Sequence, residues 1–126
     1  MNDLPPLQLG YPRTELRREL VDAVLRGDKT ATAGLLEEYE AEGETPEAPG
    51  THCALLGYDD EPVAIVEVTE SRVVPAGEID EQFARDEGEG FESVEDWRVA
   101  HEHFFGRELT PGTQIVAVRF RLVERL

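Results

Sequence analysis

Cysteine is almost absent from this sequence of 126 residues, because Cys53 is the only one. A single cysteine excludes an intramolecular disulfide and a zinc site built from several cysteines. No stretch approaches the roughly 18 apolar residues that a membrane-spanning helix needs, and the N-terminal residues resemble no secretion signal. We therefore expect a protein of the reducing cytoplasm that does not bind membranes, with Cys53 as a small core residue in a buried strand.

Positive charge is also scarce. Twelve Lys and Arg residues face 28 Asp and Glu residues, which gives a formal net charge of −16. Nonspecific binding to RNA or DNA requires a basic face that neutralises phosphates, so we expect no strong binding of this kind. A small nucleoside, or the end of a single-stranded RNA in a local cationic pocket, is the partner compatible with this charge. The acidity also agrees with a protein that stays soluble in salt.

The length predicts a single domain over residues 1–126, with residues 1–12 as an extended N-terminal segment. A chain of this size can bury a core without disulfides or metals. We expect no cofactor and no bound metal, and the sequence leaves the oligomeric state open.

Hydrophobic periodicity predicts four helices, at 14–27, 33–42, 78–86 and 93–106, and three strands, at 52–56, 63–74 and 116–123. In the first helix, apolar residues such as Leu20 and Val24 form one side, and charged residues, Arg17 among them, occupy the other faces. The strands are too short and too clustered for a parallel β-α-β fold. The predicted class is α+β, a small mixed β-barrel flanked by helices.

Lysine is rarer than arginine: Lys29 is the only lysine beside eleven arginines. A desolvated ammonium can lose its proton and act as a base or nucleophile, whereas a guanidinium stays charged. Lys29 follows the first predicted helix in a polar turn with Thr30 and Thr32. In an extended turn Thr30 faces away from Lys29, whereas in a coiled turn Thr32 comes alongside and can serve as a hydroxyl nucleophile. An ordinary solvated turn is the structural alternative.

Two carboxylates alternate with glycines in the segment Glu87-Gly88-Glu89-Gly90. Glycines suit a close approach of the backbone to a ligand, and the carboxylates suit an oxygen-ligated metal. The structural alternative is a helix end followed by a polar loop.

The last predicted helix carries Trp97, Arg98 and His101 at spacings that place them close together. An aromatic ring, a cation and an imidazole can line a nucleobase pocket. Alternatively, Trp97 and Phe104 lie in the core and His101 bonds to a backbone carbonyl. His101 and His103 face different sides of the helix, so a dedicated zinc site is not expected.

Three segments taken together resemble the ASCH family, whose members share homology with a domain of a transcriptional coactivator. The segments are Leu25-Arg26-Gly27-Asp28-Lys29-Thr30-Ala31-Thr32, Phe83-Ala84-Arg85-Asp86-Glu87-Gly88-Glu89-Gly90, and Trp97-Arg98 followed by His101 and Phe104-Phe105. Their order and spacing are similar to those of the longer bacterial members, over residues 23–120. The resemblance implies a PUA-like β-barrel with a cleft beside it, and a role in recognition of RNA or nucleosides.

A shorter branch of the family resembles amidohydrolases that remove acetyl from N4-acetylcytidine with a Lys, a Thr and a Glu. These align with Lys29, Thr32 and Glu87, which the resemblance therefore implies to be catalytic. Other members resemble ribonucleases acting on single-stranded RNA. This chain is longer than the short branch, with the inserted helix 33–42. As substrate-binding residues we take Thr30, Glu89, Trp97, Arg98 and His101, with Arg98 or amides near Gly88 as oxyanion donors.

Three functions follow from these residues. The first is hydrolysis of N4-acylated cytidine or a related nucleoside. The second is binding of RNA or a modified nucleotide without a reaction, and the third is cleavage of single-stranded RNA.

Overall fold

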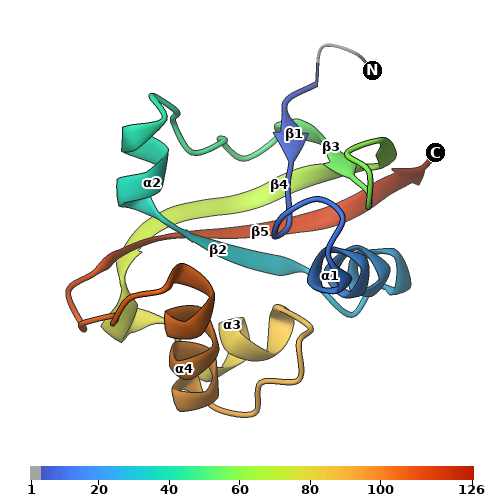
Figure 1. The fold of residues 1–126 in the computed structure, drawn as a ribbon. Helices are drawn as coiled ribbons and strands as arrows, with labels where there is room; N and C mark the ends of the chain where they lie inside the picture. Colours follow the sequence, from blue (N-terminus) through green and yellow to red (C-terminus); the bar gives the residue numbers. More distant parts are fainter. Residues whose placement is uncertain (1–3) are drawn as a thin grey trace.

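The computed structural model describes residues 4–126, which form one mixed sheet with helices packed against it (Figure 1). The strands are β1 (Pro6–Leu7), β2 (Ala31–Leu35), β3 (His52–Leu56), β4 (Pro62–Pro75) and β5 (Gln114–Arg125). The helices are α1 (Glu15–Arg26), α2 (Leu36–Ala41), α3 (Glu81–Asp86) and α4 (Val94–Phe105), with a 3-10 turn at Ala76–Glu78.

The strand order is β1-β3-β4-β5-β2. β1 pairs with β3 in parallel, and the other ladders are antiparallel. The predicted α+β class is therefore confirmed. Within residues 4–126 no ladder joins the edge strands β1 and β2, so the sheet is open and the predicted closure into a barrel is not observed.

The core lies on both faces of β5. Val116, Val118 and Phe120 belong to one buried cluster with residues of α1, whereas Ile115 and Ala117 belong to a second cluster with residues of α3 and α4. The alternation of apolar residues with Arg119 and Arg121 along this strand predicts one buried and one exposed face, and this holds only in the later part of β5. In its first half the strand lies between two layers of helices, and both of its faces are buried.

Strand β2 is the main difference from the prediction. A helix was expected from Ala33, but residues Ala31–Leu35 pair with β5, and α2 begins only at Leu36. Alanine and leucine favour helix locally, but hydrogen bonds to a strand some eighty residues away in sequence override this propensity. The addition of β2 gives Lys29 a fixed position between α1 and the sheet edge.

Two smaller differences concern helix boundaries and the N-terminal segment. The helix expected from Glu78 begins at Glu81, because the side chain of Asp80 accepts a hydrogen bond from the Phe83 amide and caps it. Of the predicted extended segment 1–12, residues 1–3 lie outside the described part. The segment's Pro6–Leu7 forms β1.

Arg17 is buried, contrary to the prediction that it lies on a solvent-exposed face of the first helix. Its guanidinium donates to the carbonyl oxygens of Leu9 (2.7 Å) and Gly57 (2.8 Å) and to Asp60 Oδ1 (2.9 Å). A fully buried guanidinium is tolerated only when its donors are satisfied in this way. Arg17 thus fixes the N-terminal segment and the β3–β4 turn against α1.

Cys53 is buried in β3 as expected, and burial raises the pKa of its thiol to about 11. Within residues 4–126, no helix has both the length and the apolar character needed to cross a membrane.

Candidate functional site

Lys29 is positioned by the C-terminal end of α1. Gly27 adopts a left-handed conformation (φ 88°) and ends the helix, as predicted. The backbone amides of Asp28 and Lys29 then both donate to the Ala23 carbonyl oxygen, at 2.9 and 3.1 Å. The chain leaves this turn directly into β2, so Lys29 lies where α1, the sheet edge and the α3–α4 loop meet.

The Lys29 ammonium lies between two carboxylates. Its Nζ is 3.6 Å from Glu87 Oε1 and 3.5 Å from Glu89 Oε2, and it donates to the Glu87 carbonyl oxygen at 3.1 Å. The Lys29 and Glu87 side chains are each 1% exposed, whereas that of Glu89 is 25% exposed. Glu89 is therefore the member of this group that reaches solvent.

Close packing of two backbone segments brings these residues together. A Cβ placed on Gly88 would lie 2.6 Å from the Asp28 carbonyl oxygen and 2.7 Å from Lys29 Cα. Gly88 also has a positive φ of 70°, so a glycine is required there on two grounds. The amide of Thr30 donates to the Asp86 carbonyl oxygen at 2.8 Å and holds the same two segments together.

Glu87 is supported from behind by α4. The Trp97 indole N–H donates to Glu87 Oε2, and His101 Nε2 lies 3.3 Å from Glu87 Oε1. The other ring nitrogen of His101, Nδ1, is 2.8 Å from the Trp97 carbonyl oxygen. Because both nitrogens of His101 face acceptors, only the imidazolium form can donate to both.

The environment separates the pKa values of the two glutamates. Burial by itself would raise the pKa of Glu87, but the His101 hydrogen bond and the Lys29 charge hold it below its ordinary value. Burial raises the pKa of Glu89, and the negative charge of Glu87 raises it further. The positive charge of Lys29 opposes this rise, but the pKa of Glu89 stays above its ordinary value. Two carboxyls whose pKa values are pushed apart suit an ionised supporting group and a group that exchanges protons.

For His101, burial would lower the pKa, but the hydrogen bond and charge of Glu87 hold it above its ordinary value. This direction agrees with the imidazolium form that the two acceptors require.

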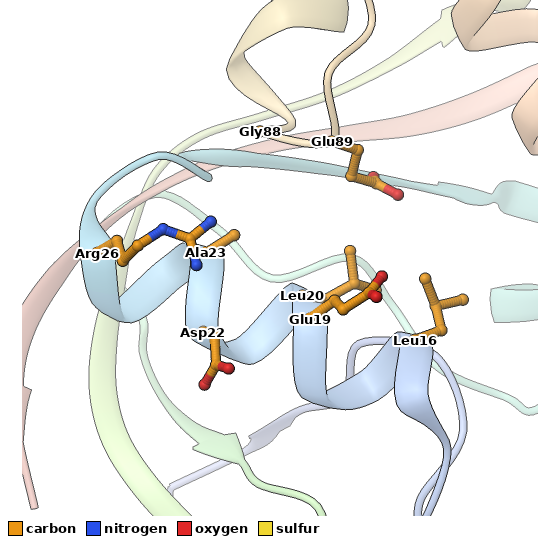
Figure 2. Close-up of a pocket in the computed structure, with 8 residues that line it drawn as sticks. All are labelled: Leu16, Glu19, Leu20, Asp22, Ala23, Arg26, Gly88 and Glu89. Carbon is orange, nitrogen blue, oxygen red and sulfur yellow. The ribbon is translucent and has the colours of Figure 1, made fainter.

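A cavity of about 370 Å³, which we call the groove, lies between α1 and the loop that follows α3. Apolar and charged side chains of α1 line it together with two loop residues: Leu16, Glu19, Leu20, Asp22, Ala23, Arg26, Gly88 and Glu89. Figure 2 shows Glu89 reaching from the loop toward Leu20 and Leu16 on α1. Glu89 therefore lines the groove and also contacts the buried Lys29.

Five of the predicted site residues come together in the structure, through the contacts described above: Lys29, Glu87, Glu89, Trp97 and His101. Trp97 is almost fully buried, so a base cannot stack on it, and its role is to hold Glu87. The alternative that places Trp97 in the core and bonds His101 to a carbonyl describes these two residues correctly. The same alternative places Phe104 in the core, which is wrong, because the side chain of Phe104 is exposed.

The other predicted site residues lie apart from this group. Arg98 forms ion pairs with Glu95 and Glu102 on the surface of α4. Thr32 lies within β2, and in the described part of the chain no side-chain hydrogen bond joins it to Lys29. The segment is extended rather than coiled from Ala31 on, because it pairs with β5. Thr30 is exposed at the edge of the site, with Oγ1 3.5 Å from the Asp86 carbonyl oxygen.

Residues 4–126 contain no group of three or more His, Cys, Asp and Glu side chains arranged to hold a metal ion. The sequence did not predict that Leu16 and Leu20, which line the groove, are site residues. The helical spacing of apolar residues, the one signal they give, predicts only that they belong to the buried face of the helix.

Fold and site together define a class: an α+β protein with an open mixed sheet and a lysine–carboxylate cluster buried beside a groove. The model of the ASCH domain family matches residues 8–124, so the chain belongs to the ASCH family. This confirms the resemblance seen in the sequence.

Two solved structures have a similar fold, and one of them is an ASCH domain. A protein from Enterococcus faecalis V583 is 26% identical, with a TM-score of 0.84, and the alignment covers 96% of this chain and 77% of that one. An ASCH domain from Lactobacillus crispatus JV V101 is 26% identical, with a TM-score of 0.81 and coverage of 97% and 80%. No curated protein matches this sequence.

Proposed function

We propose that this ASCH protein hydrolyses N4-acylated cytidine or a related acylated nucleoside at the Lys29–Glu89 pair. The observation that carries the proposal is a buried ammonium 3.5 Å from a partly exposed carboxylate that reaches into the groove. The raised pKa of Glu89 beside the lowered pKa of Glu87 supports a division of roles. Glu89 exchanges protons with the substrate, while ionised Glu87 holds Lys29 in place.

In the proposed reaction, ionised Glu89 takes a proton from a water molecule, whose oxygen attacks the acyl carbonyl carbon. The carbonyl oxygen becomes an oxyanion that the Lys29 ammonium stabilises. The C–N bond then breaks, and Glu89 returns its proton to the departing N4 nitrogen. The products are a carboxylic acid and the free nucleoside, so one water is consumed for each amide hydrolysed.

Thr32 provides a second version of the reaction, in which Lys29 takes the hydroxyl proton and Thr32 attacks the carbonyl. No contact links Thr32 to Lys29 in the described residues, and Thr32 does not line the groove. The contacts therefore favour water as the nucleophile. Thr32→Ala separates the two versions: full activity supports water, and a loss as large as that of a Lys29 variant supports the hydroxyl.

The test of the proposed function is hydrolysis of N4-acetylcytidine by purified protein, followed by chromatography of released cytidine. Glu89→Gln keeps the shape of the side chain and removes proton exchange, and we expect kcat to fall about 100-fold or more. Glu108→Gln, the same change at an exposed glutamate that does not line the groove, is the matched control and should retain activity. Glu89→Gln with wild-type kcat would refute the mechanism.

Binding of a modified nucleotide without a reaction is the second candidate, favoured by the near-complete burial of Lys29. Incubation of N4-acetylcytidine with the wild-type protein distinguishes the two, because a binding protein leaves the compound unchanged whereas the hydrolase releases cytidine. In Lys29→Arg, which preserves the charge, a binding protein should also keep its affinity, provided that circular dichroism shows the variant to be folded. Cleavage of single-stranded RNA stays a prediction from the sequence.

A further inference from the structure

Two aromatic side chains that take no part in the proposed reaction meet on the surface. The rings of Tyr11 and Phe104 are stacked, with centroids 5.8 Å apart and planes at 27°. Tyr11 precedes α1 and is 67% exposed, while Phe104 lies in the last turn of α4 and is 39% exposed. Neither ring fills the core, so packing alone does not account for the pair.

The pair stands at one end of the groove. Leu16, which lines the groove, lies 3.7 Å from the Cβ position of Gly10, the residue before Tyr11. Leu16 precedes Leu20 by four residues, about 6 Å along the helix axis. Glu89 reaches toward both leucines from the opposite wall (Figure 2). The two rings are not among the lining residues, but they lie near the Leu16 end of the groove, because Tyr11 directly follows Gly10.

A row of rings connects the pair to the buried cluster. Phe104 contacts Phe105 at a centroid distance of 5.6 Å, and Phe105 contacts His101 at 5.7 Å. His101 in turn holds Glu87. The surface rings therefore lie on the same side of α4 as His101, which contacts the Lys29 cluster through Glu87.

The charges along the groove limit its occupant. Glu19, Asp22 and Glu89 line it, and its one lining cation, Arg26, is already paired with Asp28 at 2.9 Å. A phosphate would approach three carboxylates without a free cation among the lining residues, whereas an uncharged ring meets apolar surface.

We propose that Tyr11 and Phe104 form a ring-stacking subsite for the base of an unphosphorylated nucleoside. The inference rests on the proposed function, which places the reacting acyl group at Lys29 and Glu89. Stacking on an exposed aromatic ring requires no phosphate contact and accepts any base with a flat face. The subsite holds the ring end of the ligand, and the acidic groove rejects the 5′-phosphorylated form.

The test is the affinity for cytidine itself, measured by NMR titration of isotope-labelled protein, so that no turnover is needed. We expect Tyr11→Ala and Phe104→Ala to weaken the binding of cytidine about tenfold. Tyr11→Phe keeps the ring and should bind as the wild type does. Val99→Ala removes another exposed apolar side chain of α4, away from the row of rings, and should also have no effect.

Cytidine 5′-monophosphate should bind more weakly than cytidine, and the difference should narrow as salt screens the carboxylates. Undetectable binding of cytidine to the wild type, equal affinity in Tyr11→Ala, or tighter binding of the monophosphate overturns the inference. If N4-acetylcytidine is not hydrolysed but Tyr11→Ala weakens cytidine binding, the proposed reaction fails and the subsite stands. If hydrolysis is observed and Tyr11→Ala binds cytidine normally, the subsite alone fails.

Discussion

At the scale of single residues, the site depends on mutual compensation of buried charges. An ionised side chain taken from water costs several kcal/mol unless opposite charges and hydrogen bonds surround it. Glu87 meets this requirement with Lys29, His101 and the Trp97 indole, which approach its carboxyl group from different sides. Replacing any one of these three partners leaves the buried Glu87 carboxylate with fewer opposite charges or hydrogen bonds. The residues of the site therefore also contribute to the stability of the fold.

The variant His101→Gln tests this compensation through the pH dependence of the free energy of unfolding. The pKa of His101 is held above its ordinary 6.5, so the native state binds this proton more tightly than the unfolded state. Its contribution is therefore complete below the ordinary pKa and is lost as pH rises through the folded pKa. Glu87 adds no slope in this pH range, because its pKa lies below 4.5 in the folded state and takes its ordinary value of 4.5 in the unfolded state, so it is ionised in both.

Urea unfolding between about pH 6 and 9 measures the effect. The free energy of unfolding of the wild type minus that of His101→Gln should shrink with rising pH, by about 1.4 kcal/mol for each unit of pKa shift. A difference that stays constant across this range would contradict the assignment of an imidazolium.

At the scale of elements, the site exists because the loop after α3 packs directly on the turn after α1. The backbone contact at Gly88 places Glu87 and Glu89 on two sides of the Lys29 ammonium. This contact and the hydrogen bond from the Thr30 amide to the Asp86 carbonyl oxygen hold the two segments together. The geometry of the site is therefore sensitive to the volume of one backbone position.

Gly88→Ala should destabilise the fold by about 1–3 kcal/mol and abolish hydrolysis, because its methyl group overlaps the Asp28 carbonyl and its φ is positive. Gly90→Ala is the matched control: Gly90 also has a positive φ, of 86°, but no atom of residues 4–126 outside its chain neighbours lies within 4 Å of its Cβ position. Thermal unfolding and the hydrolysis assay compare the two variants. Equal losses in both would show that backbone strain, rather than the close approach, is the cause.

At the scale of the whole molecule, the net charge of −16 opposes compaction, because 28 acidic residues repel one another across a small surface. Several surface ion pairs reduce this repulsion locally, among them Arg119 with Asp86 and Arg121 with Glu67. The twelve basic residues are too few to neutralise the rest.

We therefore expect the melting temperature to rise by about 2–5 °C between low salt and 0.5 M NaCl, as screening weakens the repulsion. Differential scanning calorimetry measures this shift. KCl at the same concentration should have the same effect, since screening depends on ionic strength. A melting temperature that falls with NaCl would mean that the ion pairs contribute more than the repulsion removes.

Elements with local signals could be predicted from the sequence. The ends of α1, the three strands after residue 50, the lone Lys29 and the glycines around Glu89 belong to this group, because each depends on neighbours within one or two turns of chain. Tertiary contacts were needed to establish that residues 31–35 form a strand, that Arg17 is buried and that Trp97 is hidden behind Glu87. They also place Glu89 beside Lys29. These outcomes depend on partners far away in the sequence, 58 residues for Lys29 and Glu87, and no local pattern records which distant segment will supply the hydrogen bonds and charges.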